Sequence, residues 1–523
     1  MGIKKLNRWL LAFFLLLPVL LLNFSHFKHR SENQIPSFFL QDDMPYYMAI
    51  AREYFDGGTP PLSYGNPFSP HPETKRHYFQ PPTLLLGILW NFTHIDPGLL
   101  LMLFGIPAAL FAIRTAIALF EYFHPLIRPL DLSYLLIFIW GGGLISVGGL
   151  CFSLYLNHDA RDWLLFDPSG GWWFLNLGRN FIYPLESIYH LLFFLGIIFG
   201  VRKQWALMLA TGFLLSICHP FTGIQFLLIL TSWLTLEYFL DRNQNSPPWW
   251  APLTALFLVF GHLGYYLVYL GKDLEHQSMM TSWKISFSMH EITFFLNLLP
   301  LFLMIWWGLR KKQYPLPWLQ RPAHRLLLLG FFMTLGLVFH DRIIPPIQPL
   351  HFDRGYLWTF LFFIALPGIH SFIRSIQKKS NSMLSILLLL LLFLSDNASW
   401  ITSHILKPTG HYHTVAQKEI FDWLNENATN QDLLVSEDRI MTYLAPTYSS
   451  VRPWYAFWWF TPFSEKNLAI QKAFFKSGEI PEEWKGRSLL ILQPRTKTAS
   501  KIQFKKLKLF QNSEYQLWQI RPQ

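Results

Sequence analysis

Charged residues are scarce in this chain. Only 14% of its 523 residues are Asp, Glu, Lys or Arg, whereas soluble globular proteins carry about 25%. Hydrophobic residues make up 52% of the chain and aromatic residues 18%, and the mean hydropathy is +0.25. A core formed entirely in water would not need so many Leu- and Phe-rich runs. The composition therefore predicts an integral membrane protein that also carries a sizeable soluble part.

Cysteine is nearly absent, since the chain contains only Cys151 and Cys218, both within apolar runs. This excludes a disulfide framework and a cysteine-rich metal site. The net charge is +11, but the basic residues cluster in short loops between apolar runs. No Lys/Arg-rich tract interleaved with aromatic residues indicates a nucleic-acid surface, so no nucleic-acid partner is expected. The basic loops are instead typical of topology signals in a membrane protein.

Eleven apolar runs predict membrane-spanning helices because of their length or their flanking residues. The first follows a basic start and lacks small residues suited to signal-peptide cleavage, so we expect an uncleaved signal anchor. A further run, PPTLLLGILWNF from Pro81, is shorter than the others. The predicted spans cover residues 9–24, 98–120, 133–156, 187–201, 204–218, 221–240, 249–271, 290–309, 324–340, 356–373 and 382–396.

The basic loops decide whether the run at 81–92 crosses the membrane. The basic N-terminus and the loops at 310–325 and 374–379 lie on one side only if this run does not cross. Cytoplasmic loops carry the excess of Lys and Arg. We therefore predict a mainly α-helical, multi-pass protein of the plasma or inner membrane, with about 11 transmembrane helices and an in-plane juxtamembrane helix over 81–92. Its N-terminus is expected in the cytoplasm and its C-terminal segment outside.

The C-terminal segment predicts a small soluble α/β domain. Helical spacing in VAQKEIFDWLNENA and in EKNLAIQKAFFKSG, which Gly478 closes, alternates with the strand-like runs DLLVSE, SLLILQP, KIQFKKLKLF and EYQLWQI. We therefore divide the chain into a membrane domain, residues 1–403, and an extracytoplasmic domain, residues 404–523. The first outer loop of the membrane domain covers about residues 25–97.

Polar residues collect in the outer loops of this topology, while the cytoplasmic loops are short and basic. Because ionisable groups near a membrane are costly, one-sided clustering predicts a site for a polar ligand with a lipid tail. The alternative for each single residue is a solvated loop, a helix-end cap or an interface anchor. Beyond the first 55 residues the candidates are His71, Lys75, Arg76, His77, Asp159, Asp162, His219, His351 and Arg354.

Two adjacent carboxylates, Asp42 and Asp43, stand where the chain leaves the first span, in QDDMPYYMAIAREYFDGG. One can act as a general base toward an acceptor, with its pKa raised by its neighbour. Alternatively, the pair can hold a divalent cation that bridges a phosphate leaving group. Lys75, Arg76, His77 and Arg354 are the predicted ligands of a donor phosphate. Acids, bases and an amphipathic setting together predict transfer of a group from a lipid phosphate.

A family resemblance supports this hypothesis. DDMPYYMAIAREYFDGG, followed by YFQPPTLLLGILW, resembles the first outer loop of GT-C glycosyltransferases such as protein O-mannosyltransferases and lipid A aminoarabinose transferases. In that superfamily an acidic pair leads into a Tyr, an Ile-x-Arg-Glu-like helix and a Pro-Pro-Leu helix lying in the membrane. The resemblance covers roughly residues 9–125. It implies a polyprenyl-phosphate-linked sugar as donor, and transfer to a glycan, lipid or protein acceptor on the extracytoplasmic face.

The resemblance also carries site residues onto this chain, including Tyr47 and Glu53. Aligning on Tyr47 and on Ile50-Ala51-Arg52-Glu53 places the family's base at Asp43, with Met44 where relatives carry Glu. Aligning on Tyr46 places the base at Asp42 instead, and we favour Asp43. No DxD motif appears in the second outer loop, where the spacing of Asp159 and Asp162 comes nearest, so dependence on a divalent cation stays open.

Two other classes of protein remain as alternatives. A transporter of lipid-linked saccharides predicts charged groups deep in the spans and paired broken helices. Few ionisable residues lie in mid-span, Arg114 being the clearest. A non-catalytic receptor or assembly protein predicts that residues 404–523 do the work and that the acidic pair is dispensable. The glycosyltransferase is the hypothesis we favour.

Overall fold

The computed structural model describes most of the chain and divides it into two compact units. The helical unit comprises Met1–Ser25, Gly105–Gly264 and Ile285–Pro408, and the outer-loop unit comprises His26–Phe104, Tyr265–Lys284 and Thr409–Gln523. The candidates Asp159 and Asp162 lie outside the described residues. The described residues are 7–56, 62–127, 129–155, 175–240, 246–283, 288–314, 317–377, 382–406, 410–495 and 507–521.

Long apolar helices dominate the structure, as the sequence predicts. Among the described residues, eight helices are long and apolar enough to cross a membrane. Two shorter apolar helices, α9 (Trp205–Cys218) and α15 (Pro322–Val338), match two further predicted spans. The eight are α1 (Arg8–Lys28), α4 (Pro97–Phe123), α8 (Pro184–Val201), α10 (Pro220–Leu240), α11 (Trp250–Leu263, extended by the helical turns Gly264–Tyr269 and Leu270–Lys272), α13 (Glu291–Arg310), α16 (Tyr356–Gln377) and α17 (Ser382–Leu406).

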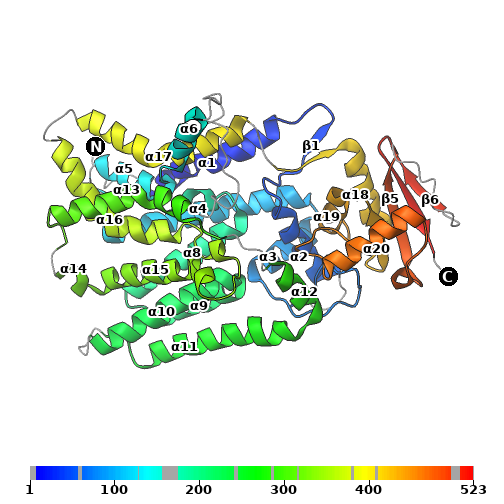
Figure 1. The fold of residues 1–523 in the computed structure, drawn as a ribbon, viewed down its shortest axis with the longest axis horizontal. Helices are drawn as coiled ribbons and strands as arrows, with labels where there is room; N and C mark the ends of the chain where they lie inside the picture. Colours follow the sequence, from blue (N-terminus) through cyan, green and yellow to red (C-terminus); the bar gives the residue numbers. More distant parts are fainter. Residues whose placement is uncertain are drawn as a thin grey trace. The chain divides into compact units, whose positions relative to one another are not determined.

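Within the helical unit these helices pack on one another. Helices α8, α9 and α10 lie side by side, α15 packs on α10, and α16 packs on α13 and α15 (Figure 1). The short helices α7 (Leu177–Asn180) and α14 (Pro317–Gln320) lie in the connections. The mainly helical, multi-pass fold class predicted from the sequence is therefore confirmed.

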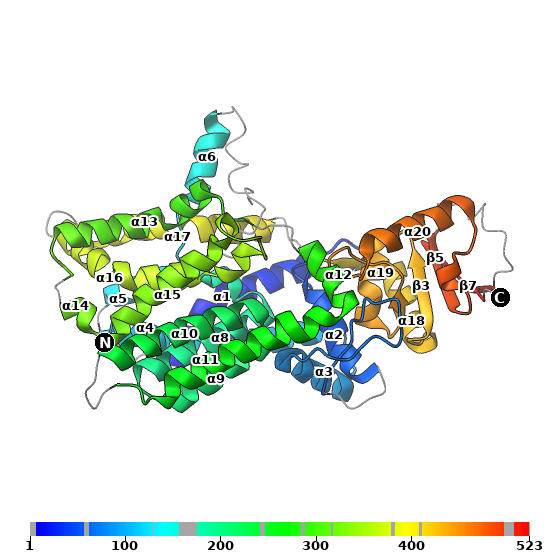
Figure 2. The ribbon, with the colours of Figure 1, turned by 60° about the horizontal axis from the view of Figure 1, so that its bottom comes forward.

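The span expected at 133–156 is present as two helices with a bend between them. Helices α5 (Pro129–Trp140) and α6 (Ile145–Tyr155) meet at an angle of 73°, and α6 points away from α5 in Figure 2. Glycines fill the break, and a Cβ added to Gly143 would lie 2.2 Å from the backbone of Asn297. Hydropathy alone favours one helix, whereas the glycine run permits a close approach that ends it.

Helix α17 supplies partners for the backbone groups that this break frees. Asn397 Nδ2 donates to the carbonyls of Trp140 at 2.7 Å and Gly141 at 3.1 Å. Asp396 Oδ1 accepts from the amide of Ser146 at 2.6 Å, at the start of α6. Unsatisfied backbone groups cannot be tolerated in a lipid environment. The Asp396-Asn397 pair therefore makes the broken helix possible.

We expect Asn397→Ala to destabilise the helical unit by about 2–4 kcal/mol, because two buried carbonyls lose their donor. The thermal unfolding midpoint of the purified protein in detergent measures the effect. Ser395→Ala is the matched control, since the Ser395 hydroxyl makes no hydrogen bond to any of the described residues. Equal midpoints for the two variants would contradict this account of the break.

The outer-loop unit joins three segments that are distant in the sequence. Strand β1 (Gln34–Pro36) pairs antiparallel with β2 (Tyr412–Thr414), linking the first outer loop to the C-terminal segment. Helices α2 (Met44–Asp56) and α3 (Pro81–Thr93) pack on each other, and α2 also packs on α19 (Arg439–Tyr448). Helix α12 (Leu274–Trp283) comes from the third of the predicted outer loops, residues 272–289.

A five-stranded mixed sheet forms the core of the C-terminal segment, as the strand-like runs predict. Its order is β4-β3-β5-β7-β6; β4, β3 and β5 are parallel, and the remaining pairs are antiparallel. Leu433, Ile491 and Trp484 lie in its hydrophobic core. Gly478 ends α20 at φ 79°, a conformation that glycine adopts without strain. The remaining elements are β3 (Asp432–Ser436), β4 (Arg452–Pro453), β5 (Ser488–Pro494), β6 (Leu507–Gln511), β7 (Tyr515–Ile520), α18 (Val415–Asn427) and α20 (Ser464–Ser477).

The three chain segments that form the outer-loop unit constrain the membrane topology. Its three segments must leave the membrane on one side, because they pack together. Both ends of α3 lie in this unit, and its 13 residues extend about 20 Å, less than the roughly 30 Å of a bilayer core. Even numbers of described apolar helices separate the segments when α5 and α6 count as one crossing. This arrangement agrees with the predicted in-plane position of α3.

Candidate functional site

The acidic pair lies at the start of α2, in the outer-loop unit. Asp42 and Asp43 immediately precede Met44, the first residue of that helix. The side chain of Asp42 is 84% exposed, whereas Asp43 is half-buried. A helix N-terminus carries a partial positive charge, which favours ionised carboxylates beside it. The N-terminus of α2 therefore favours the ionised forms of Asp42 and Asp43, which lie side by side in the outer-loop unit.

Side chains of the C-terminal segment fix this end of α2. His411 Nε2 lies 3.0 Å from Asp42 Oδ1, and this contact lowers the pKa of Asp42. The hydroxyl of Tyr443 donates to the carbonyl of Asp42, and Thr447 Oγ1 donates to the carbonyl of Pro45 at 3.0 Å. The predicted C-terminal domain thus contacts the predicted catalytic loop directly.

Aromatic rings pack beside the acidic pair. Tyr46 stacks on Phe460 with ring centroids 4.0 Å apart, and the ring of Tyr443 lies parallel to that of Phe460 at 6.2 Å. Tyr47, a candidate from the sequence, packs its ring against Tyr46 at 5.7 Å. Burial and the charge of Asp43 raise the pKa of Tyr46 above its ordinary value. Its hydroxyl therefore stays protonated beside that carboxylate.

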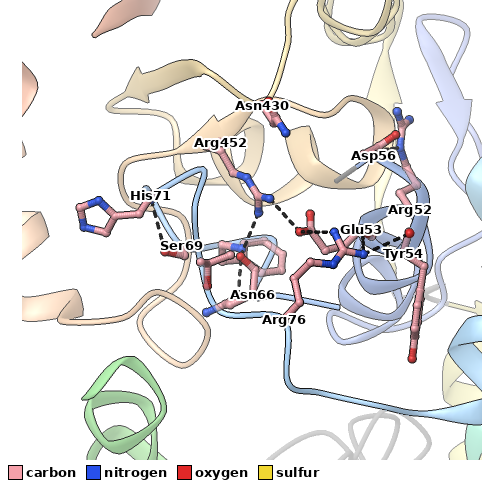
Figure 3. Close-up of polar contacts among 12 residues, drawn as sticks. Arg52, Glu53, Tyr54, Asp56, Asn66, Ser69, His71, Arg76, Asn430 and Arg452 are labelled. Carbon is pink, nitrogen blue, oxygen red and sulfur yellow. Dashed lines mark hydrogen bonds and ion pairs between the residues drawn. The ribbon is translucent and has the colours of Figure 1, made fainter. Parts of the chain in front are cut away.

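Glu53 forms a buried ion pair that the sequence did not predict. Its Oε1 accepts from Arg452 Nη2 at 2.8 Å, and the two side chains are 6% and 3% exposed (Figure 3). Arg452 Nη1 also donates to the carbonyl of Asn66 at 2.9 Å. Burial raises the pKa of Glu53, while the charge of Arg452 opposes that rise. One guanidinium thereby joins α2, the first outer loop and β4.

Arg76, a predicted phosphate ligand, contacts backbone in this structure. Its Nη2 donates to the carbonyls of Glu53 and Tyr54 at 3.1 Å and of Ser63 at 2.8 Å. Its Nη1 lies 3.9 Å from Glu53 Oε1. The guanidinium therefore ties the end of α2 to the following loop. A phosphate-binding role for Arg76 stays a prediction.

The other candidates of the first outer loop lie on or near its surface. Lys75, whose side chain is 74% exposed, pairs with Asp273 at 3.2 Å. His77 is half-buried, its carbonyl accepts from Tyr265 Oη at 2.8 Å, and burial lowers its pKa. His71 is exposed. His71, Lys75 and His77 therefore lie in the same loop as Arg76, which their positions in the sequence already imply.

The third outer loop fixes the loop that carries these candidates, a role the sequence did not predict. Glu275 on α12 accepts from Ser69 at 2.9 Å and from Thr74 at 3.1 Å. Tyr78 Oη and His276 Nδ1 are hydrogen bonded at 2.9 Å. Burial lowers the pKa of His276 to about 4, so this imidazole is neutral at pH 7. The mixed acids and histidines of this loop were the only signal in the sequence.

Three candidates from separate loops meet in the helical unit. Arg354, which is 2% exposed, is hydrogen bonded through Nη2 to His351 Nδ1 at 2.6 Å and to His219 Nε2 at 3.2 Å. Its Nη1 forms an ion pair with Glu186. Burial lowers the pKa of His351 to about 3, so it is neutral and accepts from the guanidinium. The structure thus brings these three residues together around a charge that Glu186 already balances.

The candidates are shared between the two units. Asp42 and Asp43 belong to the outer-loop unit, whereas Arg354 and its histidines belong to the helical unit. Among the described residues, no group of three or more His, Cys, Asp or Glu side chains is suited to hold a metal ion. Dependence on a divalent cation stays open.

The whole chain is similar in fold to a solved membrane enzyme. ArnT from Cupriavidus metallidurans in the apo state superposes with a TM-score of 0.50 at 11% identity, covering 97% of each chain. The chain has the fold of ArnT. ArnT is an aminoarabinose transferase of the GT-C superfamily, so the resemblance predicted from the first outer loop is confirmed at the level of fold.

Two further solved structures give lower TM-scores. ArnT from the same organism bound to undecaprenyl phosphate gives a TM-score of 0.48 at 11% identity, covering 97% of each chain. The archaeal oligosaccharyltransferase AglB from Archaeoglobus fulgidus, in complex with an inhibitory peptide and a dolichol-phosphate, gives 0.43 at 12% identity, covering 93% of this chain and 70% of AglB. No protein-family model and no curated protein match the sequence.

We expect Arg452→Met to destabilise the outer-loop unit by about 3–5 kcal/mol, because Glu53 would remain buried without its main partner. Hydrogen exchange over α2 and β4 measures the loss of protection. The control is Lys485→Met, which breaks the exposed Lys485–Glu482 pair and should cost about 0–1 kcal/mol. Unchanged exchange over α2 in the Arg452 variant would show that the pair does not support this helix.

Proposed function

We propose that the protein is a membrane glycosyltransferase that takes a sugar from a polyprenyl-phosphate donor and transfers it to an acceptor on the extracytoplasmic face. The first-loop motif and the fold shared with ArnT support this assignment. ArnT has been solved with undecaprenyl phosphate. What carries the proposal is the position of Asp42 and Asp43, at the start of α2 and held by His411 and Tyr443 of the C-terminal segment.

Asp43 is the proposed general base. It deprotonates the hydroxyl or amine of the acceptor, whose oxygen or nitrogen then attacks the anomeric carbon of the donor sugar. The bond between that carbon and the phosphate oxygen breaks, and the polyprenyl phosphate leaves with the electron pair. Asp42 is the weaker base, because the contact with His411 lowers its pKa. Asp43, which is half-buried beside Tyr46, is therefore the proposed general base.

The leaving phosphate needs a cation, and Lys75 is the proposed first contact. Its side chain is 74% exposed and pairs with Asp273 at the surface. The Asp273 side chain is only 12% exposed, but it also accepts a hydrogen bond from the amide of His276 at 3.0 Å, so it keeps a partner when a phosphate takes the ammonium group of Lys75. Arg76 and Arg354 remain proposed ligands, but their guanidinium groups are already bonded within the protein.

We expect Asp43→Asn to lower the transfer rate by a factor of about 10²–10⁴, the contribution usual for general-base catalysis. Asp42→Asn should lower it less. The assay incubates the purified protein with polyprenyl-phosphate-linked sugars and an acceptor extract, and measures release of the polyprenyl phosphate. The thermal midpoint of each variant should equal that of the wild type.

Glu465→Gln in the first turn of α20 is the control for removing a carboxylate elsewhere in this unit. It should transfer at the wild-type rate. Full activity of both Asp variants would overturn the proposed function.

We expect His411→Gln to shift the acidic limb of the pH–rate profile to higher pH. The contact with His411 holds the pKa of Asp42 below its ordinary value, so Asp42 stays ionised to lower pH in the wild type. Without the contact its pKa rises, and Asp42 takes up a proton sooner as the pH falls. In the Asp42→Asn background, where no carboxyl group titrates at residue 42, His411→Gln should leave the limb unmoved, and this attributes the shift to Asp42. An unmoved limb in His411→Gln contradicts the prediction.

A further inference from the structure

We propose that the groove between α18 and the β6–β7 hairpin binds a saccharide. Together with the proposed function, this makes the groove the site for the acceptor, which would then be a glycan or a glycan-bearing molecule. The groove lies entirely in the outer-loop unit and contains no candidate from the catalytic loop.

The groove has the size of a ligand site. Its volume is about 650 Å³, within the roughly 300–1,000 Å³ of typical small-molecule sites. One wall is a face of α18, and the other is the end of β6 with the turn that follows it. Its lining residues are Glu419, Asp422, Trp423, Glu426, Phe510, Gln511, Asn512 and Ser513.

The two walls are fixed to each other before any ligand binds. Asn512 Nδ2 in the hairpin turn donates to the carbonyl of Ala416 in α18 at 2.7 Å. Thr414 Oγ1, at the N-terminal cap of α18, donates to Glu514 Oε2 at 2.9 Å. A preformed groove avoids the entropy cost of ordering its walls on binding.

The chemistry of the lining fits a sugar. Glu419, Asp422 and Glu426 lie at i, i+3 and i+7 along α18 and so share one face of the helix. The rings of Trp423 and Phe510, both half-buried, have centroids 6.4 Å apart. Carboxylates accept hydrogen bonds from hydroxyl groups, and aromatic faces pack on the apolar faces of pyranose rings. A saccharide offers both partners along its length.

The charge of the groove favours the acceptor over the phosphate-bearing donor as its ligand. Three carboxylates line the groove, and a cleft lined by one sign of charge repels ligands of the same sign. The nearby cations contact the lining from outside it: Lys418 pairs with Asp422 at 2.7 Å, Lys508 donates to Gln511 Oε1 at 2.8 Å, and Arg495 donates to the carbonyl of Asn512 at 3.2 Å. The donor phosphate, anionic lipid headgroups and nucleic acids are therefore disfavoured, and a neutral or cationic saccharide is favoured. An apolar chain would leave the carboxylates desolvated without partners.

Helix α18 also connects this groove to the proposed catalytic helix. Arg52 Nη2 on α2 donates to Asn425 Oδ1 on α18 at 3.1 Å. The guanidinium of Arg52 lies 4.3 Å from the ring of Trp90 on α3 and is bonded to Asp56. A saccharide held on α18 is thereby attached to the same framework that carries Asp42 and Asp43.

The test is binding of the full-length protein, kept in a detergent without sugar headgroups, to an array of defined hexasaccharides. The neutral set contains glucose, mannose, galactose and N-acetylglucosamine oligomers, and the charged set contains the glucosamine hexamer and a sulfated heparin hexasaccharide. We expect at least one neutral or cationic oligomer to bind, and the sulfated one not to bind. Failure of every neutral and cationic oligomer, or preference for the sulfated one, overturns the proposal.

Variants assign the binding to this groove. The double variant Glu419→Gln with Glu426→Gln should weaken binding at least tenfold, and Trp423→Phe should also weaken it without unfolding α18. Glu465→Gln, which removes a carboxylate from α20, should bind as the wild type does. Unchanged affinity in both groove variants overturns the assignment, even when an oligomer binds.

The outcome is separable from that of the proposed function. Asp43→Asn should bind the oligomer normally while failing to transfer sugar. In the transfer assay the groove variants should raise KM for the acceptor and leave kcat unchanged. Saccharide binding together with full activity of both Asp variants would overturn the function but not the groove, and the reverse pattern would overturn the groove alone.

Discussion

The outer-loop unit depends on the buried ion pair between Glu53 and Arg452. Taking two charges out of water is expensive, and their attraction offsets that cost only when the geometry is good and further hydrogen bonds are made. Arg452 meets that condition by also bonding the carbonyl of Asn66. The pair joins residues 399 positions apart in the sequence. Any conformation that separates the C-terminal segment from α2 therefore leaves a carboxylate and a guanidinium buried and unpaired.

This constraint changes how the C-terminal segment is understood. The sequence suggested a separate soluble domain, and a receptor hypothesis in which that domain does the work. In the structure His411, Tyr443, Thr447 and Arg452 all bond to α2 or to the residues just before it. Deleting the segment would disturb the acidic pair in either hypothesis. Only substitutions such as those at Asp43, which leave the framework intact, can separate an enzyme from a receptor.

Much of the fold could be predicted from the sequence because its determinants are local. Hydropathy placed the apolar helices, short apolar runs placed β3 and β5, the strand-like run EYQLWQI placed β7, and Gly478 marked the end of α20. The break between α5 and α6 could not be predicted from hydropathy, because it depends on Asp396 and Asn397, which come from α17. Its local signal was the glycine run at 141–143.

The candidate site was predictable in its residue types but not in its partners. Sequence reasoning treated Arg76 and Arg354 as cations available to a phosphate, because nothing nearby in the sequence balances them. Glu186 reaches Arg354 from 168 positions away, and the carbonyls of α2 reach Arg76 through the fold. Neither partner has a sequence signature. Helix α19, which holds Asp42 through Tyr443, was not predicted at all.

A general electrostatic argument follows from these two arginines. A guanidinium stays protonated in a protein, so a buried arginine must be compensated by the fold itself. Glu186 compensates Arg354, and a set of backbone carbonyls compensates Arg76. If either arginine bound a phosphate, it would lose these contacts, and a buried acceptor would be left unpaired. The exposed Lys75 avoids both costs, because its ammonium group is hydrated when unpaired and its partner Asp273 keeps the hydrogen bond from the amide of His276. The polar residues of a loop therefore indicate where an anion can bind, but the burial of each cation determines whether it is available. In the first outer loop this argument favours Lys75 over Arg76 as the phosphate ligand.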